Sequence, residues 1–237
     1  MIVSNISVFL YMKSIVIDVS CFISLMLSIS GIGNAQQMIN GHKCVDLGLS
    51  VKWSEENLIV SDGTGNSGLY AWGETKTKAS SYSWKNYTLF SDKNGNNKPY
   101  TDKNGNGVTW DDGDLIEDGE LINIGNNISG TQYDVARVVW GGSWRIPTKN
   151  EFQELIDKCK WIWTKKGTQE GYEVYGPNGN TIFLPTFKTS KKNGYWSASL
   201  CDISDEGNAY FLSISPGVII MNYVDRYYGE CIRPVSN

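Results

Sequence analysis

The chain has 237 residues, of which 41% are hydrophobic and 19% charged, and its formal net charge is −4. This is an ordinary globular balance. No basic stripe is present to neutralise phosphates, so a nucleic-acid partner is not expected. Aromatic residues make up 12% of the chain and there are 25 glycines, which favours short strands joined by turns over a helical bundle.

The first 35 residues have the pattern of a targeting segment. One basic residue, Lys13, precedes a largely apolar run, Val19–Ile32, and the segment ends in small residues at Gly33–Ala35. This pattern predicts a signal peptide over 1–35, cleaved after export. An anchor helix and lipidation at Cys21 are the alternatives, but the run is shorter than the ~20 apolar residues of a spanning helix. No later segment is apolar enough to span a membrane.

Residues 36–237 are expected to form a single α+β domain. Alternating apolar and polar residues predict a first strand over 45–53, and Leu69–Gly73 has the pattern of a short buried strand. Residues from about 76 to 131 are rich in Asn, Gly, Asp and Ser. They are expected to form a long, loop-like insertion, because such a stretch carries no periodic pattern.

The second half of the chain carries the clearest signals. Asp134–Val139 predicts a short helix, and a longer helix is expected after Pro147, because Thr148 and Glu151 form a capping box ahead of apolar residues at helical spacing. Trp161 and Trp163 are expected to begin a strand. Further strands are predicted over 171–174, 181–184, 195–200, 208–214, 217–223 and 230–235.

Short segments from Val45 to Val235 also carry a family pattern: 45–53, Tyr70–Thr75, Trp140–Thr148, Glu151–Leu155, Gly176–Asn180, Phe183–Pro185, Tyr195–Ser199 and Ile232–Val235. In this order they resemble the Fibrobacter succinogenes major paralogous domain family, except over about 91–131. The resemblance implies a C-type-lectin-like fold, similar to that of formylglycine-generating enzymes, in a periplasmic, surface or secreted protein of a Gram-negative anaerobe. It implies no established activity.

The segment Trp140–Thr148 is expected to be structural. Trp140 and Trp144 are large core residues, and Arg145 is expected to hydrogen-bond loop carbonyls or a buried carboxylate. The resemblance implies that Arg145 opens the run that caps the helix and that Arg233 closes the domain near the C-terminus.

Four cysteines follow residue 35, at positions 44, 159, 201 and 231. An exported protein can oxidise such thiols. We expect a disulfide between Cys201 and Cys231, because both lie in the strand-rich C-terminal third; four free, buried thiols are the alternative. No cysteine or histidine spacing indicates zinc.

Calcium is the one cofactor that the sequence suggests. Asp102, Asn104 and Asn106 occupy the first three ligand positions of an EF-hand-type loop and are followed by glycine. The closing glutamate is absent, and Asp111 and Asp112 are candidates to replace it. The alternative is a solvated turn.

Trp84, Tyr87 and Trp110 lie in loop-like sequence and are candidates to stack on a sugar ring. The alternative is that they hold the insertion against the domain. The only histidine, His42, lies in a polar stretch and is expected to be solvated, and no nucleophile motif occurs. No catalytic residue is therefore expected.

These observations predict an exported, non-catalytic module that binds carbohydrate or a cell-surface protein. An enzyme acting on glycans or sulfatases and a structural component of surface assembly are the alternatives. Sugar binding predicts an exposed loop tryptophan beside a groove, an enzyme predicts converging titratable groups, and a structural role predicts an apolar patch or an open sheet edge.

Overall fold

The structure is a computed structural model that describes residues 37–59, 68–78, 82–92, 119–186, 194–204 and 206–237. The chain divides into two units, Met1–Gln37 and Met38–Asn237. The predicted signal peptide lies outside the described residues, and every described residue except Gln37 belongs to the second unit. No helix among the described residues is long and apolar enough to cross a membrane.

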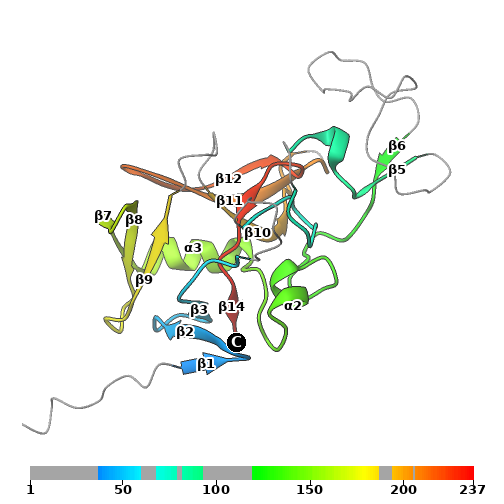
Figure 1. Ribbon diagram of the computed structural model, residues 1–237. Helices are drawn as coiled ribbons and strands as arrows, with labels where there is room; N and C mark the ends of the chain where they lie inside the picture. Colours follow the sequence, from blue (N-terminus) through cyan, green and yellow to red (C-terminus); the bar gives the residue numbers. More distant parts are fainter. Residues whose placement is uncertain (1–36, 60–67, 79–81, 93–118, 187–193, 205) are drawn as a thin grey trace, which may run out of the picture. The chain divides into compact units, whose positions relative to one another are not determined.

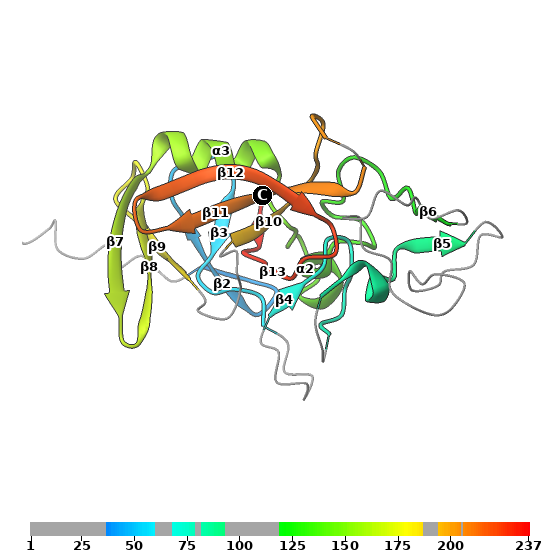
Figure 2. The same cartoon turned by 90° about the horizontal axis from the view of Figure 1, so that it is seen from above.

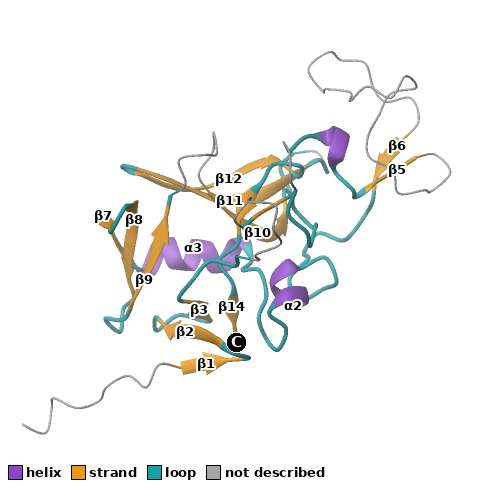
Figure 3. Cartoon of the chain, viewed as in Figure 1, coloured by secondary structure: helices purple, strands orange, loops and turns teal. Residues whose placement is uncertain are grey.

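Antiparallel strands dominate the described residues, together with two α-helices (Figures 1 and 3). This composition is that of an α+β or mostly-β protein. The elements in chain order are β1 (Gln37–Ile39), β2 (His42–Asp46), β3 (Lys52–Ser54), β4 (Leu69–Tyr70), the 3₁₀ helix η1 (Trp84–Asn86), β5 (Phe90–Asp92), β6 (Gly119–Leu121), α2 (Val135–Val139), α3 (Lys149–Lys158), β7 (Lys160–Lys166), β8 (Gln169–Tyr175), β9 (Thr181–Pro185), β10 (Gly194–Leu200), β11 (Asn208–Ser215), β12 (Val218–Asp225), β13 (Glu230–Cys231) and β14 (Val235–Ser236).

The largest sheet in the described residues has the strand order β12-β11-β10-β13-β4, and a second has the order β1-β2-β3-β14. Strands β7-β8-β9 and β5-β6 form two smaller sheets. The parallel pair is β10 with β13, where Tyr195 lies opposite Cys231. In the second sheet Val235 lies opposite Trp53, so the C-terminal strand completes a sheet that begins near the start of the domain (Figure 1).

The long helix and most of the later strands lie where the sequence predicts them. Thr148 is the N-cap of α3, and the reciprocal capping box with Glu151 is present. Such a cap contributes about 1 kcal/mol. Asp134 caps α2 in the same way by accepting from Ala136 and Arg137.

Three local predictions are wrong. Residues 45–53 form a hairpin rather than one strand, because Cys44 pairs with Ser54 and Asp46 with Lys52 across a turn. The loop-like insertion contains η1, β5 and β6. The predicted strand 230–235 is divided between β13 and β14, which belong to different sheets.

The core consists of two main clusters. One packs Phe152 and Leu155 of α3 against Trp53 and Tyr195. The other gathers Trp72, Trp144, Trp196 and Phe211. In Figure 2, α3 lies beside the strands of the largest sheet, and its apolar residues therefore have a face to cover.

Candidate functional site

Two of the three aromatic residues predicted to meet a sugar, Trp84 and Tyr87, are core residues. Trp84 is 6% exposed and Tyr87 is fully buried. Trp84 packs edge-on against Tyr87 and Tyr227. The Tyr87 hydroxyl donates to the Trp72 carbonyl at 2.7 Å and accepts from Arg226 Nε at 2.9 Å. The prediction that Trp84 and Tyr87 are available to a ligand is therefore wrong, because the residues around η1 use them to attach to the domain.

The other insertion residues named above lie outside the described residues: Asp102, Asn104, Asn106, Trp110, Asp111 and Asp112. Within the described part of the chain, no group of three or more His, Cys, Asp or Glu side chains is arranged to hold a metal ion. The calcium site stays a prediction.

The expected disulfide between Cys201 and Cys231 is not formed, and all four described cysteines are free. The strand register gives the reason. Cys231 lies opposite Tyr195, and Cys201 is six residues further along the chain. An irregularity between Trp196 and Leu200 shortens this stretch, but it still spans about four positions of β11, roughly 13 Å at the usual strand rise. A disulfide needs α-carbons less than about 7 Å apart. Burial also raises the pKa of the Cys231 thiol, which disfavours the thiolate needed for exchange.

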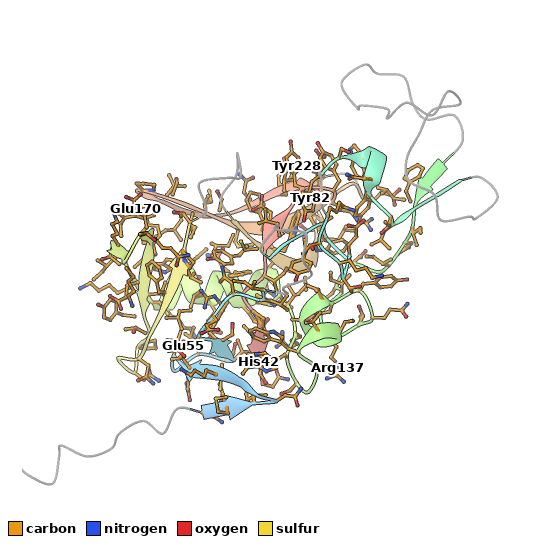
Figure 4. The ribbon with its side chains drawn as sticks, viewed as in Figure 1. His42, Glu55, Tyr82, Arg137, Glu170 and Tyr228 are labelled. Atoms are coloured by element: carbon orange, nitrogen blue, oxygen red, sulfur yellow. The ribbon has the colours of Figure 1, made fainter. Side chains whose placement is uncertain are left out.

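The tryptophans of the segment Trp140–Thr148 are packed inside the domain, as expected for a structural role. Trp144 is fully buried and Trp140 is 8% exposed. Trp144 Nε1 donates to the Ile39 carbonyl at 2.8 Å. His42, labelled in Figure 4, stacks on Trp140 with ring centroids 3.9 Å apart. His42 is thus packed on an indole rather than fully solvated.

Two arginines join parts of the domain, Arg145 by an ion pair over a short separation in sequence and Arg233 over a long one. Arg145 makes a two-pronged ion pair with Glu151, at 2.9 and 2.6 Å. Arg233 is 1% exposed and donates to the backbone carbonyls of Ser54, Glu55 and Phe183. Burial lowers the pKa of Arg233, and its bonds to neutral carbonyls offset part of the desolvation cost.

A hollow of about 410 Å³ opens where the insertion leaves and rejoins the domain. We name it the insertion-base hollow. Its lining comes from three stretches of the chain: the start of the insertion and the residues just before it, a segment within the insertion, and the two residues after the insertion. Its lining residues are Gly73, Glu74, Thr75, Lys76, Thr88, Leu89, Gln132 and Tyr133.

Several polar contacts hold Glu74 at the floor of the insertion-base hollow. Glu74 is 6% exposed, and its Oε1 accepts from the Thr88 N–H at 2.6 Å and the Thr88 hydroxyl at 2.8 Å. Its other oxygen pairs with Lys78, which also donates to the Asn86 carbonyl at 2.6 Å. The Glu74 charge is therefore neutralised within the protein.

Gly73 is required at the floor for two reasons. Its φ is +81°, in the left-handed region that glycine favours. A β-carbon there would lie 2.6 Å from Ile124 Cδ1 and 2.7 Å from Leu89 Cδ1. Any other residue would push these side chains away and change the shape of the hollow.

The rim differs from the floor in that its polar side chains have no polar partner among the described residues. Within the described part of the chain, none of the following side chains has a polar interaction with another residue: Thr75, Lys76, Gln132 and Tyr133. Lys76 and Gln132 are exposed, and Thr75 and Tyr133 are half-buried. Together they offer hydroxyl, amide and ammonium groups around one opening.

Sequence analysis missed Gln132 and Tyr133, although a signal existed. Both follow the predicted end of the insertion, while Lys76 stands at its start. The two ends of an inserted loop must lie close together on the domain that it leaves. Side chains flanking an insertion are therefore candidates to share a site.

The insertion-base hollow offers polar groups that could bind a ligand. Of the lining residues, Glu74 is held by Thr88 and Lys78, so it has no free oxygen for proton transfer. The rim instead presents donors and acceptors to a ligand, as small-molecule sites do. Comparison of the chain with protein-family models, with curated proteins and with solved structures found no match.

Proposed function

We propose that this chain is an exported, non-catalytic binding module that takes a hydroxyl-rich ligand, such as a carbohydrate, in the insertion-base hollow. The observation that carries the proposal is the rim, where four polar side chains that have no polar interaction with any described residue line one opening. Sugar hydroxyls both donate and accept hydrogen bonds, and Gln132 and Thr75 do the same. Tyr133 adds a half-buried ring that a sugar C–H face can contact.

A C-type-lectin-like fold is part of the proposal. It is supported by the role of Thr148, which caps α3, and by Arg233, which joins three backbone segments near the C-terminus. Both match what the family resemblance implies. Export is supported by the pattern of residues 1–35.

Binding to a glycan array, with calcium and with a chelator, tests the function. Gln132→Ala removes an exposed amide from the rim, and Tyr133→Phe removes a hydroxyl while keeping the ring in place. Each change is expected to lower affinity about fivefold to tenfold, because one hydrogen bond contributes about 1 kcal/mol. Gln153→Ala is the matched control, since Gln153 is an exposed glutamine on α3 outside the hollow.

The outcomes are distinct. Loss of binding in Gln132→Ala but not in Gln153→Ala supports the hollow as the site. Equal binding by both variants would mean that the ligand binds outside the insertion-base hollow. An array with no bound glycan in either buffer would overturn the carbohydrate proposal. Loss of binding with chelator alone would point to the predicted calcium loop.

A further inference from the structure

Strand β12 forms one edge of the largest sheet. It is the outermost strand in the order β12-β11-β10-β13-β4, and in Figure 2 it lies outside β11 and β10. Its eight residues pair with β11 over their whole length, from Val218 opposite Ser215 to Asp225 opposite Asn208. The register has no bulge, so the free edge is regular along its length.

The other edge strands of these sheets in the described residues carry features that oppose further pairing. Three of the seven residues of β7 are lysines, and β9 ends in Pro185. Strands β1, β4 and β14 have three residues or fewer. Proteins use charge, proline and short length in this way to prevent edge-to-edge association. In β12 no charged residue and no proline occurs from Val218 to Val224.

One hydrogen bond shows which backbone groups of β12 face its free edge. Arg226 donates its N–H to the Gly207 carbonyl at 2.7 Å, and this pair continues the β11–β12 register. Bonded pairs alternate along an antiparallel ladder. The N–H and C=O groups of Ile219, Met221 and Tyr223 therefore point away from β11. Tyr223 N–H accordingly donates to the neighbouring Asn222 side chain at 2.8 Å.

The exposed side chains of β12 are mainly apolar. Val218 is 44% exposed, Ile220 52% and Tyr223 41%. Ile219 and Met221 are partly buried against the cluster that contains α3. Apart from the Tyr223 N–H, which donates to Asn222, the outward backbone groups of β12 have no partner among the described residues. An apolar strand with such groups at a regular edge is a template for another strand.

We infer that β12 pairs with β12 of a second copy of this chain, antiparallel and related by a two-fold axis at Met221. In this register Met221 lies opposite Met221 and Ile219 opposite Tyr223, so the residues with outward backbone groups meet each other. No like charges are opposed, because Asp225 lies opposite Gly217. The strand is thus complementary to itself, as a two-fold interface requires, and two five-stranded sheets join into one.

Sedimentation velocity of the full chain at increasing concentration tests the inference. The chain is expected to dimerise reversibly, and Ile220→Lys is expected to raise the dimer dissociation constant by about tenfold or more, since it places a charge on each copy at the edge. Ile162→Lys is the matched control: Ile162 is 39% exposed on the lysine-rich edge strand β7. It is expected to leave dimerisation unchanged.

A cysteine series tests the register without disrupting the strand. Met221→Cys places two thiols opposite each other at about 5.5 Å between α-carbons, within disulfide range, so oxidation is expected to give a covalent dimer. Ile219→Cys is the control, since its copies are about 13 Å apart along the strand in this register. A chain that stays monomeric up to about 200 µM, which covers weak interfaces, overturns the inference. So does dimerisation unchanged by Ile220→Lys, or cross-linking of Ile219→Cys rather than Met221→Cys.

Discussion

Replacing Glu151 with glutamine would remove the carboxylate on which Arg145 and Thr148 converge. Arg145 donates to both oxygens, at 2.9 and 2.6 Å, and the Thr148 N–H donates to Oε2 at 2.7 Å. A glutamine keeps one acceptor and turns an NH₂ group toward the remaining donors. Hydrogen bonds to charged groups contribute about 1.5–3 kcal/mol, and an unmet buried donor costs about 1–3 kcal/mol. The side chains of Arg145 and Glu151 are 17% and 14% exposed. Because both are largely buried, we expect Glu151→Gln to lower the free energy of unfolding by about 3 kcal/mol.

The loss of stability in Glu151→Gln is also expected to depend on pH. Burial alone would raise the pKa of Glu151, but hydrogen bonds from Arg145 and Thr148 outweigh burial and hold the pKa below its ordinary value. Such a carboxyl stabilises the fold above its unfolded pKa of about 4.3, and this stabilisation is lost as the pH falls through the folded pKa. The wild type and Glu151→Gln should therefore differ in stability at neutral pH and converge in acid.

Urea unfolding at about pH 7 and about pH 3 measures both effects, because these values lie on either side of the glutamate pKa. Glu170→Gln is the control, since the Glu170 side chain is exposed and has no polar interaction in the described part of the chain. Its effect should stay within about 0.5 kcal/mol. The reasoning is refuted if Glu151→Gln is as stable as the control at neutral pH, or if the difference in stability does not shrink in acid.

Three further experiments have defined outcomes. Asp134 is fully buried and accepts four backbone N–H bonds, so Asp134→Asn should lower the urea midpoint by the equivalent of about 2 kcal/mol. Gly73→Ala should cost more stability than Gly167→Ala, because both have positive φ but only Gly73 is crowded; equal thermal shifts would contradict this. Alkylation of the unfolded chain without reductant should label Cys201 and Cys231, and a linked peptide pair in the mass spectrum would contradict it.

Local signals predicted the parts of the fold that local physics determines. The capping box of Thr148 and Glu151 acts over three residues, so it marked the start of α3 correctly. Residues 45–53 show where such reasoning stops. Their alternation continues through the turn between β2 and β3, because two short strands on either side of a turn can keep one apparent period.

Burial and position in a sheet could not be inferred from local sequence. Trp84 stands among polar residues, yet Tyr87 and Tyr227 enclose it, and Tyr227 lies more than a hundred residues away. The strand over 217–223 was predicted, but its place at a sheet edge depends on the order of five strands. The insertion-base hollow likewise combines residues from three separate stretches of the chain.

The two proposals together make one prediction that neither makes alone. An open hollow with a few hydrogen-bonding side chains, each contributing about 1 kcal/mol, binds a single ligand weakly. Two copies joined along β12 would present two hollows, and simultaneous engagement raises apparent affinity by about 10²–10⁴ on a multivalent surface. Ile220→Lys should therefore weaken binding to a densely glycan-coated surface while leaving binding to the same free glycan unchanged. Equal loss in both assays would mean that the substitution damages the hollow itself, and no loss in either would mean that the dimer does not contribute to binding.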